Sequence, residues 1–177
     1  MATSRALSAG TFVGGGGGAM TLLGTATVSG AAATTLTLSG LDLSAYKAFF
    51  ATFRLDNATG SAANISLYYN ADTTATNYYV QSVTGNNTTV SGARSNSAIL
   101  ATMDANETLS WTATIVNDLN GRPRAFLHLS DGAAASVVMH VESHVWTSAT
   151  NITDITLSSS VASSLAIGST FSAWGIT

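Results

Sequence analysis

The segment YKAFFATFRLDN (residues 46–57) gives the clearest indication of the fold, because its side chains alternate with a period of two residues. This is the period of a β-strand, in which successive side chains point to opposite faces of a sheet. Phe49 and Phe53 fall on one face and Phe50 on the other. Aromatic residues on both faces predict a central strand buried on both sides, and Trp111 and Phe126 are further core candidates.

Ten further runs of the same kind lie on either side of this stretch, and turn residues such as Gly, Asn and Asp separate them. The single proline, Pro123, begins one of them, where a missing N–H costs little. Many short strands at this spacing predict an all-β fold, an antiparallel jelly roll or β-sandwich. The ten runs cover residues 21–30, 34–40, 64–70, 77–83, 97–103, 108–117, 124–130, 136–146, 152–159 and 169–176.

The first residues differ from the rest of the chain. Residues 1–18 end in five consecutive glycines, which are free to adopt many backbone conformations and are costly to order. No Lys-Ser/Thr pair follows them, so a phosphate-binding loop is excluded. We expect residues 1–18 to be a flexible arm and residues 19–177 to be a single β domain.

Composition excludes several classes of protein. Of the 177 residues, 46% are hydrophobic and only 8% are charged, with 6 Lys and Arg against 9 Asp and Glu and a net charge of −3. So few cations argue against nucleic-acid binding, and no apolar run reaches the roughly 20 residues of a membrane span. The chain has no cysteine for a disulfide framework and no apolar region typical of a secretory signal near its start. Since 78 residues are Ala, Thr or Ser, the composition suits a surface that packs closely against other copies.

One constellation could carry chemistry. His140, Glu142 and His144 share one face of the run at residues 136–146, and two histidines with a carboxylate are the ligand set of a facial metal triad. Three successive positions on one face span roughly 13 Å, however, which is too far to close on one ion within one chain. Three symmetry-related copies could instead supply one ligand each, or the three side chains could form a polar surface opposite an apolar face of Val137, Met139, Val141 and Val145. We expect the polar surface, with no metal or other cofactor.

Catalytic motifs are weak. SAYK (residues 44–47) matches the Ser-x-x-Lys of acyl enzymes, but the supporting motifs are missing. Glutamate occurs only at Glu107 and Glu142, and no partner for an acid–base pair can be placed. We therefore expect no enzymatic activity.

Three segments resemble a β-domain of tailed-bacteriophage virion structural proteins. The first, at residues 39–81, contains NADTTATNYY (residues 70–79), where Ala71 stands in place of the usual glycine. The others are NGRPRAFLHLS (residues 120–130) and the closing segment at residues 152–176. The resemblance implies a trimeric jelly roll of a head-decoration (cement) protein or of a tail-tip or fibre protein, without a catalytic motif.

The resulting functional hypothesis is a homotrimeric capsid decoration protein. It would be made in the host cytoplasm, lie on the capsid surface of the virion and stabilise the head by binding across major capsid subunits. The arm, with Arg5, Phe12, Val13, Gly14 and Gly18, is the predicted capsid contact. The alternative is a tail-fibre or tail-tip adhesin that binds host saccharide. The candidates for contact between subunits are Tyr78, Tyr79, Trp146 and Trp174, and the same aromatic set, without Trp174, would serve the adhesin.

Overall fold

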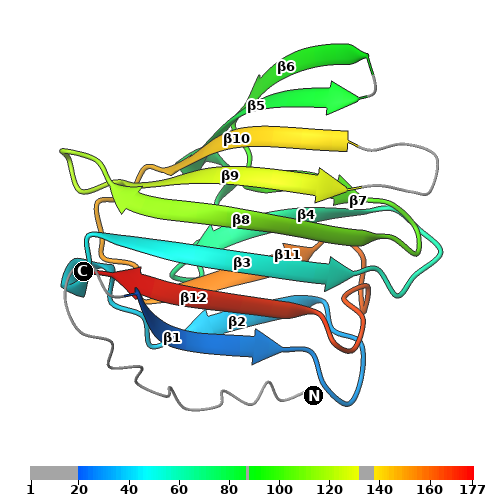
Figure 1. Cartoon of the computed structure of the whole chain (residues 1–177), viewed down its shortest axis with the longest axis horizontal. Helices are drawn as coiled ribbons and strands as arrows, with labels where there is room; N and C mark the ends of the chain where they lie inside the picture. Colours follow the sequence, from blue (N-terminus) through cyan, green and yellow to red (C-terminus); the bar gives the residue numbers. More distant parts are fainter. Residues whose placement is uncertain (1–19, 87, 132–137) are drawn as a thin grey trace.

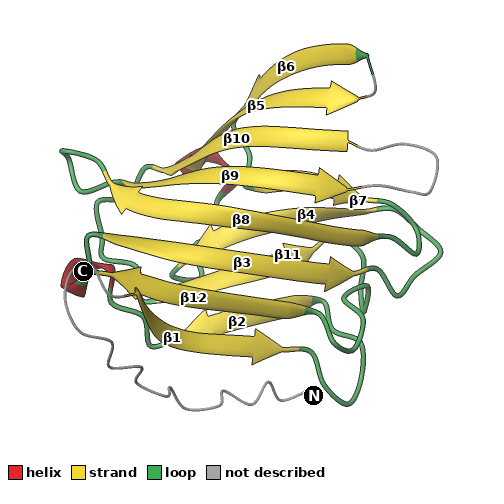
Figure 2. Ribbon diagram, in the orientation of Figure 1, coloured by secondary structure: helices red, strands yellow, loops and turns green. Residues whose placement is uncertain are grey.

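Two antiparallel β-sheets pack face to face in the computed structural model, which describes residues 20–86, 88–131 and 138–177 (Figures 1 and 2). The eight-stranded sheet has the order β1-β12-β3-β8-β9-β10-β5-β6, and the four-stranded sheet has the order β2-β11-β4-β7. In chain order the strands are β1 (Met20–Thr27), β2 (Thr35–Ser39), β3 (Ala48–Asp56), β4 (Ala63–Tyr69), β5 (Tyr78–Asn86), β6 (Thr89–Ser95), β7 (Ile99–Met103), β8 (Thr108–Asn117), β9 (Pro123–Asp131), β10 (Val138–Trp146), β11 (Asp154–Ser159) and β12 (Thr170–Ile176), with single 3-10 turns at Leu43–Ala45 and Ala75–Asn77.

The prediction of an all-β fold with two packed antiparallel sheets is confirmed. Eight strands pair in a nested order, β1 with β12, β2 with β11, β3 with β8 and β4 with β7, while the hairpins β5–β6 and β9–β10 widen one sheet. The finer prediction of a jelly roll stays a prediction. The arm at residues 1–18 and its candidate contact residues lie outside the described residues.

Strand β3 is central, as predicted, since it lies between β12 and β8. Only one of its faces is fully buried, however. Phe49 and Phe53 point between the sheets, and the Phe53 ring lies 4.6 Å from that of Phe171 and 5.0 Å from that of Trp111. Phe50 lies on the half-exposed outer face, because the four-stranded sheet covers one side of the eight-stranded sheet and nothing in the described part of the chain covers the other. The prediction of burial on both faces was therefore wrong.

Strand β6 has no counterpart among the predicted runs. It pairs with β5 at the edge of the larger sheet, beyond the reach of the four-stranded sheet (Figure 1), and all seven of its residues are exposed. A strand with two exposed faces needs no alternation of apolar and polar residues, so its sequence TVSGARS carries no periodic signal.

The corner between β4 and β5 contains the segment on which the phage resemblance chiefly rests. Asn70 and Ala71 both have positive φ angles, 50° and 58°, and the N–H of Asp72 donates to the carbonyl of Tyr69 at 2.9 Å. This is the backbone of a type I′ β-turn, with two left-handed residues, and Asn-Gly is the preferred pair for such a turn. Glycine is expected at position 71 because a side chain is unfavourable in this conformation.

Candidate functional site

The three polar residues of β10 share one face, as their spacing predicted, but that face points into the protein. Glu142 is 4% exposed and His144 is fully buried, whereas Met139 and Val141 are 59% and 41% exposed on the outer face. This reverses the expected orientation of the strand. The reason lies at the end of β10, where Trp146 points to the same face as His144. The indole of Trp146 is buried in the core, so this face of the strand points inward.

The buried pair has few polar partners. The His144 ring lies 5.7 Å from the ring of Tyr69 and 5.3 Å from that of Tyr78, and neither of its nitrogens has a hydrogen-bond partner. Oε2 of Glu142 also lacks one. Burial lowers the pKa of His144 to about 3 and raises that of Glu142 to about 8, so both side chains are neutral at pH 7. His140 is partly buried, and its Nδ1 is 2.9 Å from the Thr84 hydroxyl.

Glu142 and His144 therefore form a neutral, buried polar pair on the inner face of the sheet. Within the described ranges, no group of three or more His, Asp or Glu side chains is placed to hold a metal ion. The buried pair of Glu142 and His144 offers no solvent-facing acid or base.

Two of the four predicted contact residues lie inside the protomer. The Tyr78 hydroxyl donates to the carbonyl of Asp72 at 2.7 Å and accepts from the Tyr69 N–H at 3.1 Å. The indole N–H of Trp146 donates to the Asp72 carboxylate at 2.8 Å. Burial would raise the pKa of Asp72, but hydrogen bonds from Trp146 and Asn77 hold it at about 2. Tyr78 and Trp146 thus stabilise the corner between β4 and β5 through these hydrogen bonds. Both side chains are buried within one protomer, which argues against their predicted roles in subunit contact and in saccharide binding.

The other two predicted contact residues lie on the outer face of the eight-stranded sheet. Trp174 packs against Phe50 with ring centroids 5.9 Å apart, and both side chains are half-buried. Tyr79 lies on β5 opposite Val145 of β10 and is also half-buried. The structure thus leaves both rings within reach of another molecule.

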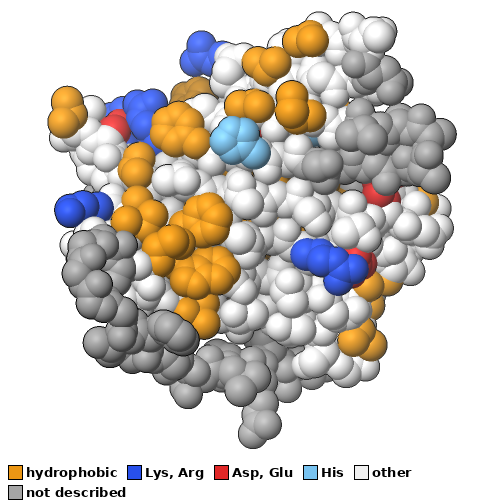
Figure 3. Space-filling view, viewed as in Figure 1, with side chains coloured by type: hydrophobic (Ala, Val, Ile, Leu, Met, Phe, Trp, Pro, Cys, Tyr) orange, Lys and Arg blue, Asp and Glu red, His pale blue; other side chains and the backbone are white. Residues whose placement is uncertain are grey.

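Large hydrophobic side chains are exposed on this outer face. Phe126 of β9 is 49% exposed and not in the core, because Ala125, Leu127 and Leu129 share the buried inner face of β9 and Phe126 points to the opposite face. Val83 and Val141 are directly opposite one another on β5 and β10 and are also exposed. Figure 3 shows hydrophobic side chains gathered in two areas of this face, one over β12 and β3 and one toward β5 and β6.

A shallow hollow also lies on this face. It has a volume of about 520 Å³ and lies where small Thr and Ser side chains alternate with larger core residues of β3, β8 and β9. Its lining includes Thr52, Ser110, Thr112, His128 and Met139. A hollow beside exposed apolar side chains is a surface that a protruding side chain of another molecule can fill.

A smaller, more polar groove lies at the end of the outer face formed by β6, β5, β10 and β9. Its volume is about 240 Å³, and its lining includes Tyr79, Gln81, Arg94, Arg124 and Ser143. None of its lining side chains is acidic. Arg94 and Gln81 are directly paired across β6 and β5, and Gln81 in turn lies opposite Ser143 of β10.

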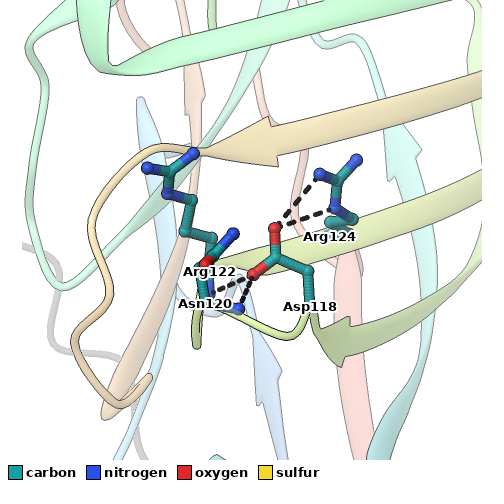
Figure 4. Close-up of polar contacts among 4 residues, drawn as sticks. All are labelled: Asp118, Asn120, Arg122 and Arg124. Carbon is teal, nitrogen blue, oxygen red and sulfur yellow. Dashed lines mark hydrogen bonds and ion pairs between the residues drawn. The ribbon is translucent and has the colours of Figure 1, made fainter.

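The turn between β8 and β9 orients one arginine of this groove (Figure 4). The Asp118 carboxylate accepts from the backbone N–H groups of Asn120 and Arg122 at 2.8 and 3.0 Å through one oxygen. Its other oxygen accepts from Nε and Nη2 of Arg124 at 3.3 and 3.1 Å. Hydrogen bonds from Arg122 first, then from Asn120 and Arg124, hold the pKa of Asp118 below its usual value. The side chain of Arg124 is therefore fixed in direction, whereas Arg94 has no ion-pair partner among the described residues.

Sequence reasoning found Tyr79 and Trp174 and missed Gln81, Arg94, Arg124 and Ser143. Their convergence depends on the pairing of four strands that are distant in sequence. No family model, curated protein or solved structure matches this chain. In the part of the chain that the structure describes, no helix has the length and hydrophobicity to cross a membrane.

Proposed function

We propose that this chain is a structural protein of a tailed-bacteriophage particle, a homotrimeric capsid decoration protein that assembles through the outer face of its eight-stranded sheet. The observation that carries the proposal is the exposure of Phe126, Met139, Val141 and Val83 on one face of a nearly uncharged chain. The trimer and the capsid as partner rest on the sequence resemblance.

Burial of this face would be favourable. Contiguous exposed apolar patches are typical of interaction sites, and interfaces of obligate oligomers are large and apolar. The outer face between the two apolar areas carries Thr and Ser rather than charged residues, with the Arg54–Asp56 pair as an exception at one end. Few charges would have to be desolvated when another subunit covers this part of the face, whereas Arg94 and Arg124 lie in the polar groove at its end.

The first experiment locates the protein in the particle. Gold-labelled antibody against the chain is applied to purified virions and viewed by electron microscopy. Dense labelling of the heads is the expected result. Labels confined to the tail end would replace the decoration proposal with the adhesin, and unlabelled virions would refute both.

The second experiment tests the surface. Sedimentation equilibrium of the full chain is expected to give a trimer, and the exposed-face variants Met139→Asp and Val141→Asp are expected to give folded monomers. Ile167→Asp is the matched control, because Ile167 is 61% exposed in the β11–β12 connection, outside the sheet. A monomeric wild-type chain, or a trimer that both sheet variants retain, would contradict assembly through this face.

A further inference from the structure

We infer that the polar groove lined by Tyr79, Gln81, Arg94, Arg124 and Ser143 binds a carboxylate-bearing sugar. The inference goes beyond the assembly role and does not depend on it. It rests on the convergence of an unpaired arginine, an oriented arginine, an aromatic ring and two neutral hydrogen-bonding side chains on one small cavity.

The charge in the groove favours an anion. Arg124 and Asp118 neutralise one another, so Arg94 brings uncompensated positive charge to a cavity without acidic lining. Guanidinium groups recognise carboxylates through parallel N–H donors, and such charge-assisted hydrogen bonds are about twice as strong as neutral ones. Because Asp118 engages only Nε and Nη2 of Arg124, the remaining nitrogen, Nη1, can also donate.

The remaining lining favours a sugar over a bare anion. Tyr79 and Val145 are cross-strand neighbours and offer an apolar surface for the C–H face of a ring. The Ser143 hydroxyl has no partner within the described residues, and Oε1 of Gln81 is free to accept, because only its Nε2 is used, toward the Ala93 carbonyl at 2.9 Å. These groups can exchange hydrogen bonds with sugar hydroxyls.

The size of the cavity limits the ligand. A volume of about 240 Å³ lies below the roughly 300–1,000 Å³ that is usual for drug-sized ligands, so the groove accommodates one ring with its substituents. Further sugar units would extend over the exposed strand β6. We therefore expect weak binding of a single uronic acid and stronger binding of a chain that contains it.

The test uses the full chain and methyl β-D-glucuronide, followed by NMR of the arginine side-chain N–H groups and the backbone. Saturable binding that shifts the Arg94 and Arg124 signals is expected, with methyl β-D-glucoside at least about tenfold weaker. Arg94→Gln should weaken glucuronide binding about tenfold or more and leave the glucoside unchanged, whereas Tyr79→Leu should weaken both. Arg54→Gln is the control, because Arg54 is an exposed arginine on the same face and pairs with Asp56 at 3.2 Å.

Several results would overturn the inference. Equal binding by Arg94→Gln and wild type would exclude a role for the arginine, and equal binding of glucoside and glucuronide would exclude a role for the carboxylate. If the tripeptide Gly-Asp-Gly bound as tightly as the glucuronide, the groove would recognise a carboxylate of a peptide and not a sugar. Absence of saturable binding by the wild type, with folding verified from its NMR spectrum, would also refute the proposal.

Discussion

Replacement of the buried Glu142 by glutamine tests how the inner face of β10 is built. The glutamate is 4% exposed, and its Oε2 has no hydrogen-bond partner. Glutamine keeps nearly the same volume and cannot ionise. We expect Glu142→Gln to be more stable than the wild type at neutral pH and to lose this advantage in acid.

The magnitude follows from the pKa of the Glu142 carboxyl, which burial raises from 4.5 to about 8. Between these two values the folded protein keeps the proton and the unfolded chain releases it, so the free energy of unfolding falls as the pH rises through this window. The raised pKa of Glu142 lowers the free energy of unfolding of the wild type by about 3 kcal/mol at pH 7 and by about 1 kcal/mol at pH 5. The stability difference between variant and wild type should therefore grow by about 2–3 kcal/mol from pH 5 to pH 7.

The buried histidine acts in the opposite direction. Burial lowers the pKa of His144 from 6.5 to about 3, so the unfolded chain binds a proton that the folded protein does not, and stability is lost as the pH falls below 6.5. Wild type and variant share His144, so its contribution cancels in the difference between them. The comparison thereby isolates Glu142.

Urea unfolding followed by tryptophan fluorescence at pH 5, 7 and 8 measures the effect. The control is Glu107→Gln, the other glutamate of the chain, whose carboxylate accepts from the Asp104 N–H at 3.0 Å in a turn. We expect a change of less than about 1 kcal/mol for this control at each pH. A stability difference between Glu142→Gln and wild type that stays constant from pH 5 to pH 7 would show that Glu142 is not buried with a raised pKa.

Three further substitutions test local features of the fold. Ala71→Gly relieves a left-handed residue (φ 58°) at an exposed position and should stabilise the protein by about 0.5–1 kcal/mol, seen as a higher urea midpoint. Gly175→Ala would place a methyl group against the ring of Tyr46 and should cost about 1–3 kcal/mol; an unchanged melting temperature would contradict this. Trp146→Phe removes the donor to the Asp72 carboxylate and should cost about 1–3 kcal/mol. It should also raise the pKa of Asp72 from about 2, measured by NMR titration of its carboxyl carbon, and a pKa that does not move would exclude the hydrogen bond.

Strand positions were predictable where one face of the strand is buried. Strands β3 and β8 alternate clearly, since Phe49 and Trp111 face the core while Thr52 and Thr112 face outward. Strand β6 was not predictable, because neither of its faces is buried and burial is what imposes the alternation.

The orientation of β9 and β10 was harder to predict than their position. Met139 and Val141 are more hydrophobic than Glu142 and His144, so hydrophobicity by itself favoured the wrong face. The position of Trp146 indicated the correct face, because it lies on the same side of the strand as Glu142 and His144 and a ring of that size on a strand next to the core is usually buried. Similarly, if Leu127 and Leu129 are assigned to the inner face of β9, the alternation of side chains places Phe126 on the outer face.

The candidate binding groove could not be predicted from the sequence. Arg94, Ser143 and Arg124 belong to three strands, and they meet only because β5 and β10 lie between β6 and β9 in the sheet. Pairing of this kind depends on the whole fold, since the register of each strand is set by the faces that its neighbours bury.

The amino-acid sequence was enough to predict the all-β class, most of the strands, the weak charge and the sharing of one face by His140, Glu142 and His144. These properties depend on composition and on the two-residue period, which are local. The packing of the two sheets was needed to learn that this face points inward, that Tyr78 and Trp146 are internal while Phe126 is exposed, and which strands are neighbours. In the described part of the chain, one four-stranded sheet covers a wider eight-stranded sheet, so which side of each strand is buried depends on segments far away in the sequence.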